Sequence, residues 1–273
     1  MKRFAAGITV VGLSLPLVAG CHPTDSQSAE GAFRGDSASH AVAFTQPADP
    51  KTFFSFRAGA DHAPDADVTS AFWKNVPPIV MDKSVLGPAV PAYRAEIRAR
   101  WTERNLYFLF ACKYEKLTVN AAPVLDRETP HLWDRDVIEL YIGDFEHTNL
   151  YRELQMSPRG EFLDNNIDST VPRAGLNGEE AWNSGFKVFA HVDEKTKVWY
   201  GEMQVPVLSI GTHAARVGDA FRVNVYRQDN VVEPLPAGAG QGRGTRDFVA
   251  WQAPGVWNPH HPEVFGVMRL VGE

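Results

Sequence analysis

The chain has 273 residues, of which 44% are hydrophobic and 22% charged, a composition that is ordinary for a soluble globular protein. This length predicts one large domain or two small ones, with enough material for a substantial core. The formal net charge of -6 excludes the basic surface that is typical of nucleic-acid-binding proteins, so no nucleic-acid partner is expected.

Residues 1–20 have the pattern of a secretory signal. Lys2 and Arg3 precede an apolar run that is too short to span a bilayer, and small residues come directly before Cys21. The ending LVAGC is similar to a bacterial lipobox, in which Cys21 carries lipid and becomes the mature N-terminus. We therefore expect a lipoprotein of the bacterial cell envelope, periplasmic or on the cell surface. The alternative is cleavage nearby, with Cys21 left as a free thiol.

Residues 21–50 are rich in Ser, Asp, Gly, Ala and Pro and show no sustained hydrophobic periodicity. Such a segment buries too little apolar surface to offset the entropy lost on ordering, so it is predicted to be a disordered tether. The remaining residues, 51–273, are predicted to form a single folded domain.

Strand signals recur at short intervals after the tether. Val, Ile, Phe, Tyr and Trp dominate these runs, and helical periodicity is scarce, with short helices expected only around 68–73 and 207–210. The pattern predicts an all-β fold, an antiparallel β-sandwich of the jelly-roll or immunoglobulin-like kind. The expected strands are Ala92–Arg100, Leu106–Tyr114, Val137–Ile142, Tyr151–Met156, Phe186–Val192, Val198–Val205, Phe221–Arg227, Phe248–Trp251 and Phe265–Val271. The expected core includes Leu106, Phe108, Phe110, Ile138, Leu140 and Ile142, with Cys112 as a buried, inert thiol.

Residues 133–144 read WDRDVIELYIGD, an acid-rich turn with one tryptophan before an alternating strand. An indole covers the apolar C–H side of a sugar ring, while carboxylates accept hydrogen bonds from its hydroxyl groups, so Trp133 is a candidate stacking ring. Side chains alternate along a strand, which places Ile138, Leu140 and Ile142 on the core side and Glu139 on the other side. Glu139 is therefore a candidate ligand contact, and Asp136 is expected to bond backbone N–H groups in the turn.

Two later stretches carry further candidates. Residues 151–160 read YRELQMSPRG, and their strand projects Arg152, Glu153 and Gln155. Residues 251–266 read WQAPGVWNPHHPEVFG and lead into the closing strand. Between them, Asn224, Tyr226 and Gln228 alternate along one strand.

Together these stretches resemble the family 9 carbohydrate-binding modules, from about Asp61 to the end of the chain. The resemblance implies a clamp that holds a terminal sugar between two aromatic rings, Trp133 and Trp257. Two extra residues between Trp257 and the Phe-Gly pair leave Trp251 as a rival, with core packing as its expected role. The resemblance also implies polar sugar contacts from Tyr226 and from Gln155, which stands where other members carry a basic residue; Arg152 is a candidate to replace that charge.

The resulting prediction is non-catalytic binding of an oligosaccharide or polysaccharide, with chain ends as the preferred target and glycoside hydrolases as partners in polysaccharide degradation. No cofactor and no metal ligands are assigned, although the Asp-rich turns could hold a structural calcium ion.

Two alternatives remain open from the sequence. A glycoside hydrolase needs two carboxylates about 5–10 Å apart, and the chain offers acids for such a pair. These acids are Asp134, Asp136, Glu139, Glu153 and Asp164. A b-type haem domain would use methionine and histidine ligands, for which the candidates are Met156, Met203, His131, His147 and His191.

Overall fold

The computed structural model describes residues 44–170, 182–229 and 247–272. The predicted signal peptide, Cys21 and most of the predicted tether lie outside the described residues. Within them, no helix is long and apolar enough to cross a membrane.

The strands are β1 Thr52–Arg57, β2 Ile79–Met81, β3 Lys83–Ser84, β4 Ala95–Trp101, β5 Asn105–Lys113, β6 Val137–Gly143, β7 Leu150–Met156, β8 Phe162–Asp168, β9 Lys187–Asp193, β10 Val198–Pro206, β11 Ala220–Asp229, β12 Asp247–Ala250 and β13 Gly266–Val271. The 3₁₀ helices are η1 Pro91–Tyr93, η2 Leu132–Asp134, η3 Val207–Ser209 and η4 Pro262–Val264.

The predicted all-β fold is confirmed, and each of the nine expected strands is present in the described residues. One expected short helix forms as the 3₁₀ turn η3, whereas residues 68–73 form turns. Four strands were not predicted, namely β1, β2, β3 and β8. β8 escaped prediction because its sequence FLDNNID places polar residues on both sides of the strand and so lacks clean alternation.

The thirteen strands of the described residues belong to one sheet, in the order β8-β7-β6-β11-β13-β1-β4-β5-β10-β9, with β12 against β11, β3 against β12 and β2 against β4. The prediction of a purely antiparallel sandwich is wrong in one respect, because β1 runs parallel to both β13 and β4. β1 and β13 come from opposite ends of the folded part, and their pairing joins the two halves of the sheet. The finer jelly-roll or immunoglobulin-like topology stays a prediction.

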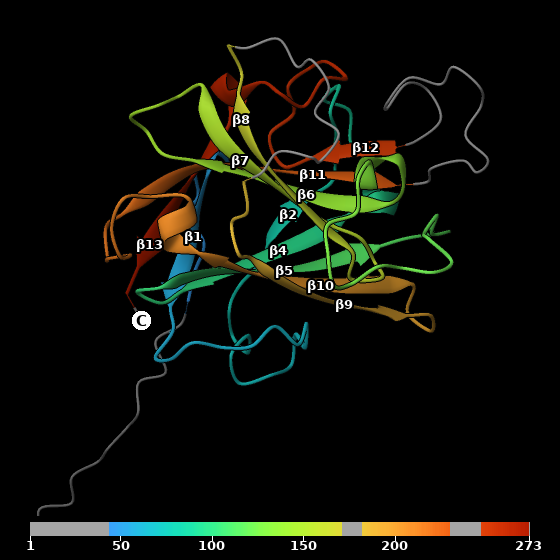
Figure 1. Cartoon of the computed structure of the whole chain (residues 1–273), viewed down its shortest axis with the longest axis horizontal. Coiled ribbons are helices and arrows are strands. Elements are labelled where there is room, and N and C mark those ends of the chain that lie inside the picture. The colour runs from blue at the N-terminus through green and yellow to red at the C-terminus, as the bar shows by residue number, and fades with distance from the viewer. Residues whose placement is uncertain (1–43, 171–181, 230–246, 273) are drawn as a thin grey trace, which may run out of the picture. The chain divides into compact units, whose positions relative to one another are not determined.

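The sheet folds over on itself into two layers (Figure 1). β7, β6, β11 and β12 lie in one layer, and β4, β5, β10 and β9 lie in the other. The core between them contains all six residues predicted for it. Cys112 is fully buried there, and burial raises the pKa of its thiol to about 11, as expected of an inert cysteine.

The folded part begins earlier than residue 51. The Phe44 ring lies 4.6 Å from the Phe56 ring, between ring centroids. The Gln46 side chain accepts a hydrogen bond from Phe54 N at 2.8 Å and donates one to Pro77 O at 2.9 Å. The last residues of the predicted tether therefore pack along β1.

Trp251 is a core residue, as predicted. Its ring meets Phe53 edge-on at 5.1 Å. A Cβ atom at Gly266 would lie 2.4 Å from the Trp251 ring, so only glycine leaves room for the indole at the start of β13. This contact gives a physical reason for the Phe-Gly pair near the end of the chain.

Candidate functional site

The outer side of the layer formed by β7, β6 and β11 is unusually polar. In register across the strands, Tyr226 pairs with Glu139, and Glu139 pairs with Gln155. Three of the five candidate ligand residues therefore lie in one row. The next row holds Asn224, Tyr141, Glu153 and Asn165. With Gln228, these side chains form what we call the polar face: Glu139, Tyr141, Glu153, Gln155, Asn165, Asn224, Tyr226 and Gln228.

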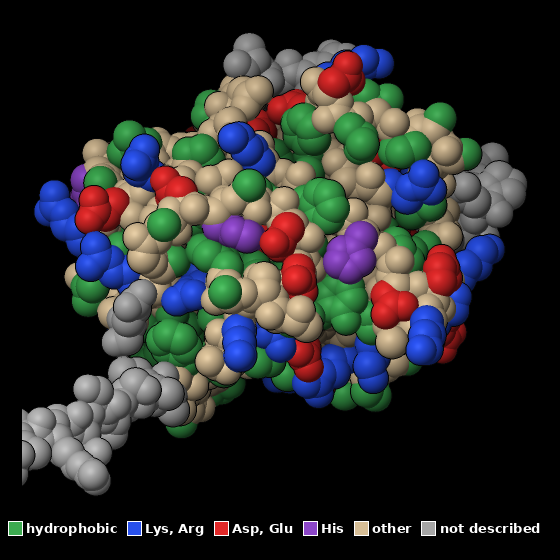
Figure 2. All heavy atoms as spheres, turned by 90° about the horizontal axis from the view of Figure 1, so that it is seen from below, with side chains coloured by type: hydrophobic (Ala, Val, Ile, Leu, Met, Phe, Trp, Pro, Cys, Tyr) green, Lys and Arg blue, Asp and Glu red, His purple; other side chains and the backbone are tan. Residues whose placement is uncertain are grey.

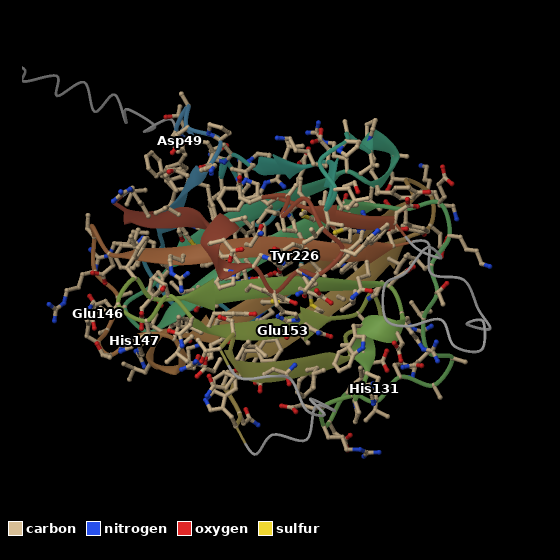
Figure 3. All side chains as sticks on the ribbon, turned by 90° about the horizontal axis from the view of Figure 1, so that it is seen from above. Asp49, His131, Glu146, His147, Glu153 and Tyr226 are labelled. Atoms are coloured by element: carbon tan, nitrogen blue, oxygen red, sulfur yellow. The ribbon has the colours of Figure 1, made fainter. Side chains whose placement is uncertain are left out.

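Figure 3 looks down on this side of the molecule, with Tyr226 and Glu153 near its middle and His131 toward one end. The polar face is screened from solvent, because none of its side chains is more than 6% exposed. The strand alternation predicted for Glu139 is confirmed, but Glu139 is buried at 1% exposure instead of solvated. Strand alternation alone could not predict this burial, because it determines the side of the sheet on which a residue lies and not what packs over that side.

Hydrogen bonds link the acids of the polar face to their neighbours. The Tyr141 hydroxyl lies 3.2 Å from Glu153 Oε1 and 3.4 Å from Glu139 Oε2. Gln155 Nε2 donates to Glu153 Oε1 at 2.6 Å, and Gln228 Nε2 donates to Glu139 Oε1 at 2.8 Å. Charge-assisted bonds of this kind hold both carboxylates in place.

Other polar atoms of the same surface are not satisfied within the described residues. Gln155 Oε1 and both side-chain polar atoms of Asn165 are buried without a hydrogen-bond partner there. Leaving a buried polar atom unpaired costs about 1–3 kcal/mol, so native proteins rarely keep such atoms without a reason. Asn165 lies next to Glu153 in register, on the strand that sequence reasoning missed. A ligand that offers both donors and acceptors could satisfy these atoms only if it reached this buried part of the sheet.

An aromatic group borders the polar face at the end where β7 begins. The His260 ring stacks on Tyr141 at 5.3 Å, and its Nδ1 shares a 2.6 Å hydrogen bond with the Tyr151 hydroxyl. Phe265 meets the Tyr151 ring edge-on at 5.3 Å. The segment between β12 and η4, which carries Trp257, therefore returns to the polar face at His260. The sequence did not single out His260, since a histidine in a loop gives no distinctive signal.

Asn224 fixes the start of the same segment. Its Nδ2 donates to Gln252 O at 2.8 Å, and its Oδ1 accepts from Gln252 N at 3.0 Å. It also donates to the Tyr226 hydroxyl at 2.7 Å, and burial raises the pKa of Tyr226. Tyr226 is therefore an uncharged phenol held within the polar network.

The two candidate stacking rings differ in their surroundings. Trp133 is 8% exposed and packs with Leu132, Val137 and Leu163 beside the polar face. Trp257 is 38% exposed, in the segment after β12. The predicted clamp, in which both rings bound one groove, stays a prediction.

The contacts of Asp136 and Arg152 test the roles predicted for these two residues. Asp136 Oδ2 accepts a hydrogen bond from Thr118 N at 2.8 Å, so it bonds a backbone N–H group as predicted, but one that lies outside its own turn. Arg152 cannot supply the charge that Gln155 lacks, because it lies on the opposite side of β7. There it donates to Ser209 O at 3.1 Å and lies over the Trp182 ring at 5.0 Å.

The residues proposed as haem ligands do not come together. Met156 and Met203 are fully buried in the hydrophobic core. His131, His147 and His191 are exposed, and His147 pairs with Asp144 at 3.3 Å. The methionines therefore fill the core, as lone methionines on strands usually do.

Comparison with known proteins places this architecture among sugar-binding modules. Residues 65–273 match the family described as carbohydrate family 9 binding domain-like. No curated protein matches the chain. A structure from Bacteroides uniformis is similar with a TM-score of 0.58 at 14% identity, over 80% of this chain and 98% of that chain. A family 9 carbohydrate-binding module from Caldicellulosiruptor kristjanssonii, in complex with glucose, gives a TM-score of 0.54 at 12% identity, over 81% of this chain and 96% of that chain. The same module in complex with cellotriose also gives 0.54 at 12% identity, over 81% and 94%. At these identities the likeness shows a shared fold.

Proposed function

The chain belongs to the carbohydrate family 9 binding domain-like family, and we propose that it binds the ends of an oligosaccharide or polysaccharide without cleaving it. Structural neighbours that were solved with glucose and with cellotriose support a β-linked glucan as the first ligand to test. The polar face is the proposed binding surface, with Trp257 and Trp133 as its stacking rings.

This proposal rests on the side-chain atoms of Gln155 and Asn165 that have no hydrogen-bond partner among the described residues. A sugar ring presents several hydroxyl groups, each of which both donates and accepts. One ring can therefore satisfy the Gln155 carbonyl and the Asn165 amide together, while Glu139 and Glu153 accept from its other hydroxyls. A purely structural role would not require these polar atoms, since apolar side chains of similar size fill such positions on a buried sheet surface.

The expected affinity is modest. Two stacked rings would remove apolar sugar surface worth roughly 3 kcal/mol, and each well-placed hydrogen bond would add about 1 kcal/mol. After the cost of association, these contributions predict a dissociation constant in the micromolar to millimolar range. That range suits capture of chain ends.

The acid pair of the polar face favours binding over hydrolysis. A glycoside hydrolase places its two carboxylates on either side of the scissile bond. Glu139 and Glu153 are instead 1% and 3% exposed, and each accepts a hydrogen bond from a glutamine amide, of Gln228 and of Gln155 respectively. Release of reducing ends from the bound oligosaccharide would reverse this conclusion.

A glycan array with the full-length protein, followed by calorimetric titration of the sugar it identifies, tests the proposal. Gln155→Ala should weaken binding by about tenfold, because it removes a contact from the centre of the surface. Gln204→Ala is the matched control, since Gln204 lies on β10 in the other layer. Equal affinities for Gln155→Ala and the parent protein would place the site elsewhere.

We also propose that lipid on Cys21 anchors the protein in the cell envelope, where it would work beside glycoside hydrolases. The motivation is the charged start, the short apolar run and the small residues before the cysteine. Cys21→Ser should move the protein from the membrane fraction to the soluble fraction. Unchanged fractionation would contradict the anchor while leaving sugar binding untouched.

A further inference from the structure

The outer side of the other layer holds a cluster of potential metal ligands. His62 Nε2 lies 3.4 Å from Glu202 Oε1 on β10 and 3.5 Å from Asp65 Oδ1. The three ligand atoms all lie within 4.8 Å of one another. Figure 2 views the molecule from this side and shows histidine and acidic side chains close together near its middle. The cluster is independent of the polar face, which belongs to the opposite layer.

The hydrogen bonding of Glu202 leaves one of its oxygens directed at the cluster. Glu202 is fully buried, and its Oε2 accepts from Asp65 N at 3.1 Å and from Ala66 N at 2.9 Å. Within the part of the chain that the structure describes, its Oε1 and the buried Nε2 of His62 have no hydrogen bond of good geometry, although the Trp73 side chain also approaches the Glu202 carboxyl. A carboxylate fixed by two backbone N–H groups thus presents its second oxygen to the imidazole nitrogen.

The spacing of these atoms argues against a simple ion pair. A hydrogen bond between a charged imidazole and a carboxylate spans about 2.7–2.9 Å. Both distances from His62 Nε2 are longer than that. A tetrahedral zinc ion with ligands at 2.0–2.1 Å sets its ligand atoms roughly 3.3–3.4 Å apart. The observed separations of 3.4 and 3.5 Å match this edge length.

The ligand types select the class of metal. Imidazole and carboxylate together suit zinc and neighbouring divalent transition metals, whereas calcium takes six to eight oxygen ligands. Asp65 Oδ1 is held by the Asp67 N–H at 2.9 Å, and the His62 ring stacks on Phe72 at 4.3 Å. These contacts orient two of the three ligands, as outer contacts do in established metal sites.

We propose that His62, Asp65 and Glu202 bind one divalent transition-metal ion of the zinc class, with the fourth position open to water. The ion would fasten residues 62–65, which precede the turns at 68–73, to strand β10. Its expected effect is to stabilise the fold, because a metal that binds only the native state adds its binding free energy to that of folding.

Calorimetric titration of the metal-stripped, full-length protein with zinc chloride tests the site. The parent protein should bind one zinc ion per chain, and calcium chloride should bind at least about tenfold more weakly. His62→Ala and Asp65→Asn should each weaken zinc binding by about tenfold or more. His147→Ala is the control, because His147 also lies 3.3 Å from a carboxylate, that of Asp144, but on an exposed turn.

Thermal unfolding gives a second measurement, in which the shift of the parent protein alone does not depend on how the variants fold. Zinc at about a hundredfold excess over its dissociation constant should raise the Tm of the parent by on the order of 5–10 °C, and that of His62→Ala by far less. The proposal would be overturned if the parent bound no zinc below millimolar concentrations. It would also be overturned if His62→Ala bound zinc as tightly as the parent, or if calcium bound as tightly as zinc.

Discussion

The two layers of this protein cover their outer sides in opposite ways. Over β5, the segment before β2 packs an apolar cluster that contains Phe56, Trp73, Val76, Tyr107 and Leu109. Over β7, β6 and β11, the covered surface is instead the polar face, in which two carboxylates are buried and the polar atoms of Gln155 and Asn165 have no partner in the described residues. Both surfaces are screened from water, but only burial of the apolar cluster stabilises the fold.

This difference separates stability from function. An apolar cluster needs no explanation beyond burial, whereas unsatisfied buried polar groups reduce stability and persist where they serve another purpose. We therefore expect substitutions within this apolar cluster to change stability and to leave sugar binding unchanged. Substitutions on the polar side should change ligand binding, and some of them should increase stability.

The largest expected effect is on the apolar side. Leu109 is fully buried there, and Leu109→Ala should reduce the free energy of unfolding by about 2–5 kcal/mol because it leaves a cavity. Sugar affinity should stay unchanged in the folded variant. Urea unfolding and calorimetric titration measure the two quantities, and a loss of affinity at full folding would break the distinction between the layers.

Trp257→Ala should do the opposite, changing sugar affinity and leaving stability almost unchanged. The ring is 38% exposed, so its loss should change the free energy of unfolding by less than about 0.5 kcal/mol. The free energy of sugar binding should fall by about 1–2 kcal/mol, because one stacking surface is removed. Trp133→Ala is a less clean test, since Trp133 also packs against Val137 and Leu163. An unchanged affinity for Trp257→Ala would remove this ring from the site.

The free energy of unfolding should also depend on pH through Glu128. Burial, together with the Asp164 carboxyl on β8, raises the pKa of Glu128 from 4.5 to about 7. The protonated form is thus favoured in the folded state, so its contribution is full below pH 4.5 and is lost as the pH rises toward 7. Since Glu128 is partly exposed, we expect a loss of about 1 kcal/mol.

Glu128→Gln keeps the uncharged shape and should flatten this part of the stability profile. Urea unfolding at a series of pH values compares the variant with the parent. Parallel profiles for the two proteins would show that Glu128 does not titrate in this range.

The smallest expected effect is that of Asn165→Leu, for which the sign of the stability change is informative. Asn165→Leu removes two polar atoms that have no partner in the described residues, so the free energy of unfolding should rise by about 0.5–1 kcal/mol. Sugar binding should weaken by about 1 kcal/mol in the same variant. A destabilised variant with unchanged affinity would mean that Asn165 has a structural role that its contacts do not reveal.

Much of the fold could be predicted from the sequence because strand periodicity is local. The alternation of residues 137–142 placed Ile138, Leu140 and Ile142 in the core and Glu139 on the other side, as found. The parallel pairing of β1 with β13 could not be predicted, since it joins segments about two hundred residues apart. The interruption of alternation in β8 likewise hid Asn165.

The row of Tyr226, Glu139 and Gln155 could be assembled from a family resemblance, because each residue lies on a recognisable strand. The burial of this row could not be predicted, since strand periodicity gives the side of the sheet but not what packs over it. His260 reaches Tyr141 and Tyr151 from a loop whose path no local pattern determines. The meeting of His62 with Glu202 similarly depends on tertiary packing across the chain.

A crystal structure of the protein with the oligosaccharide identified by the glycan array tests the central claim most directly. We expect a terminal sugar ring over β6 and β7, with its hydroxyl groups within hydrogen-bond distance of Gln155 Oε1 and the Asn165 amide. A sugar bound on the other layer, or one that leaves these atoms unpaired, would contradict it.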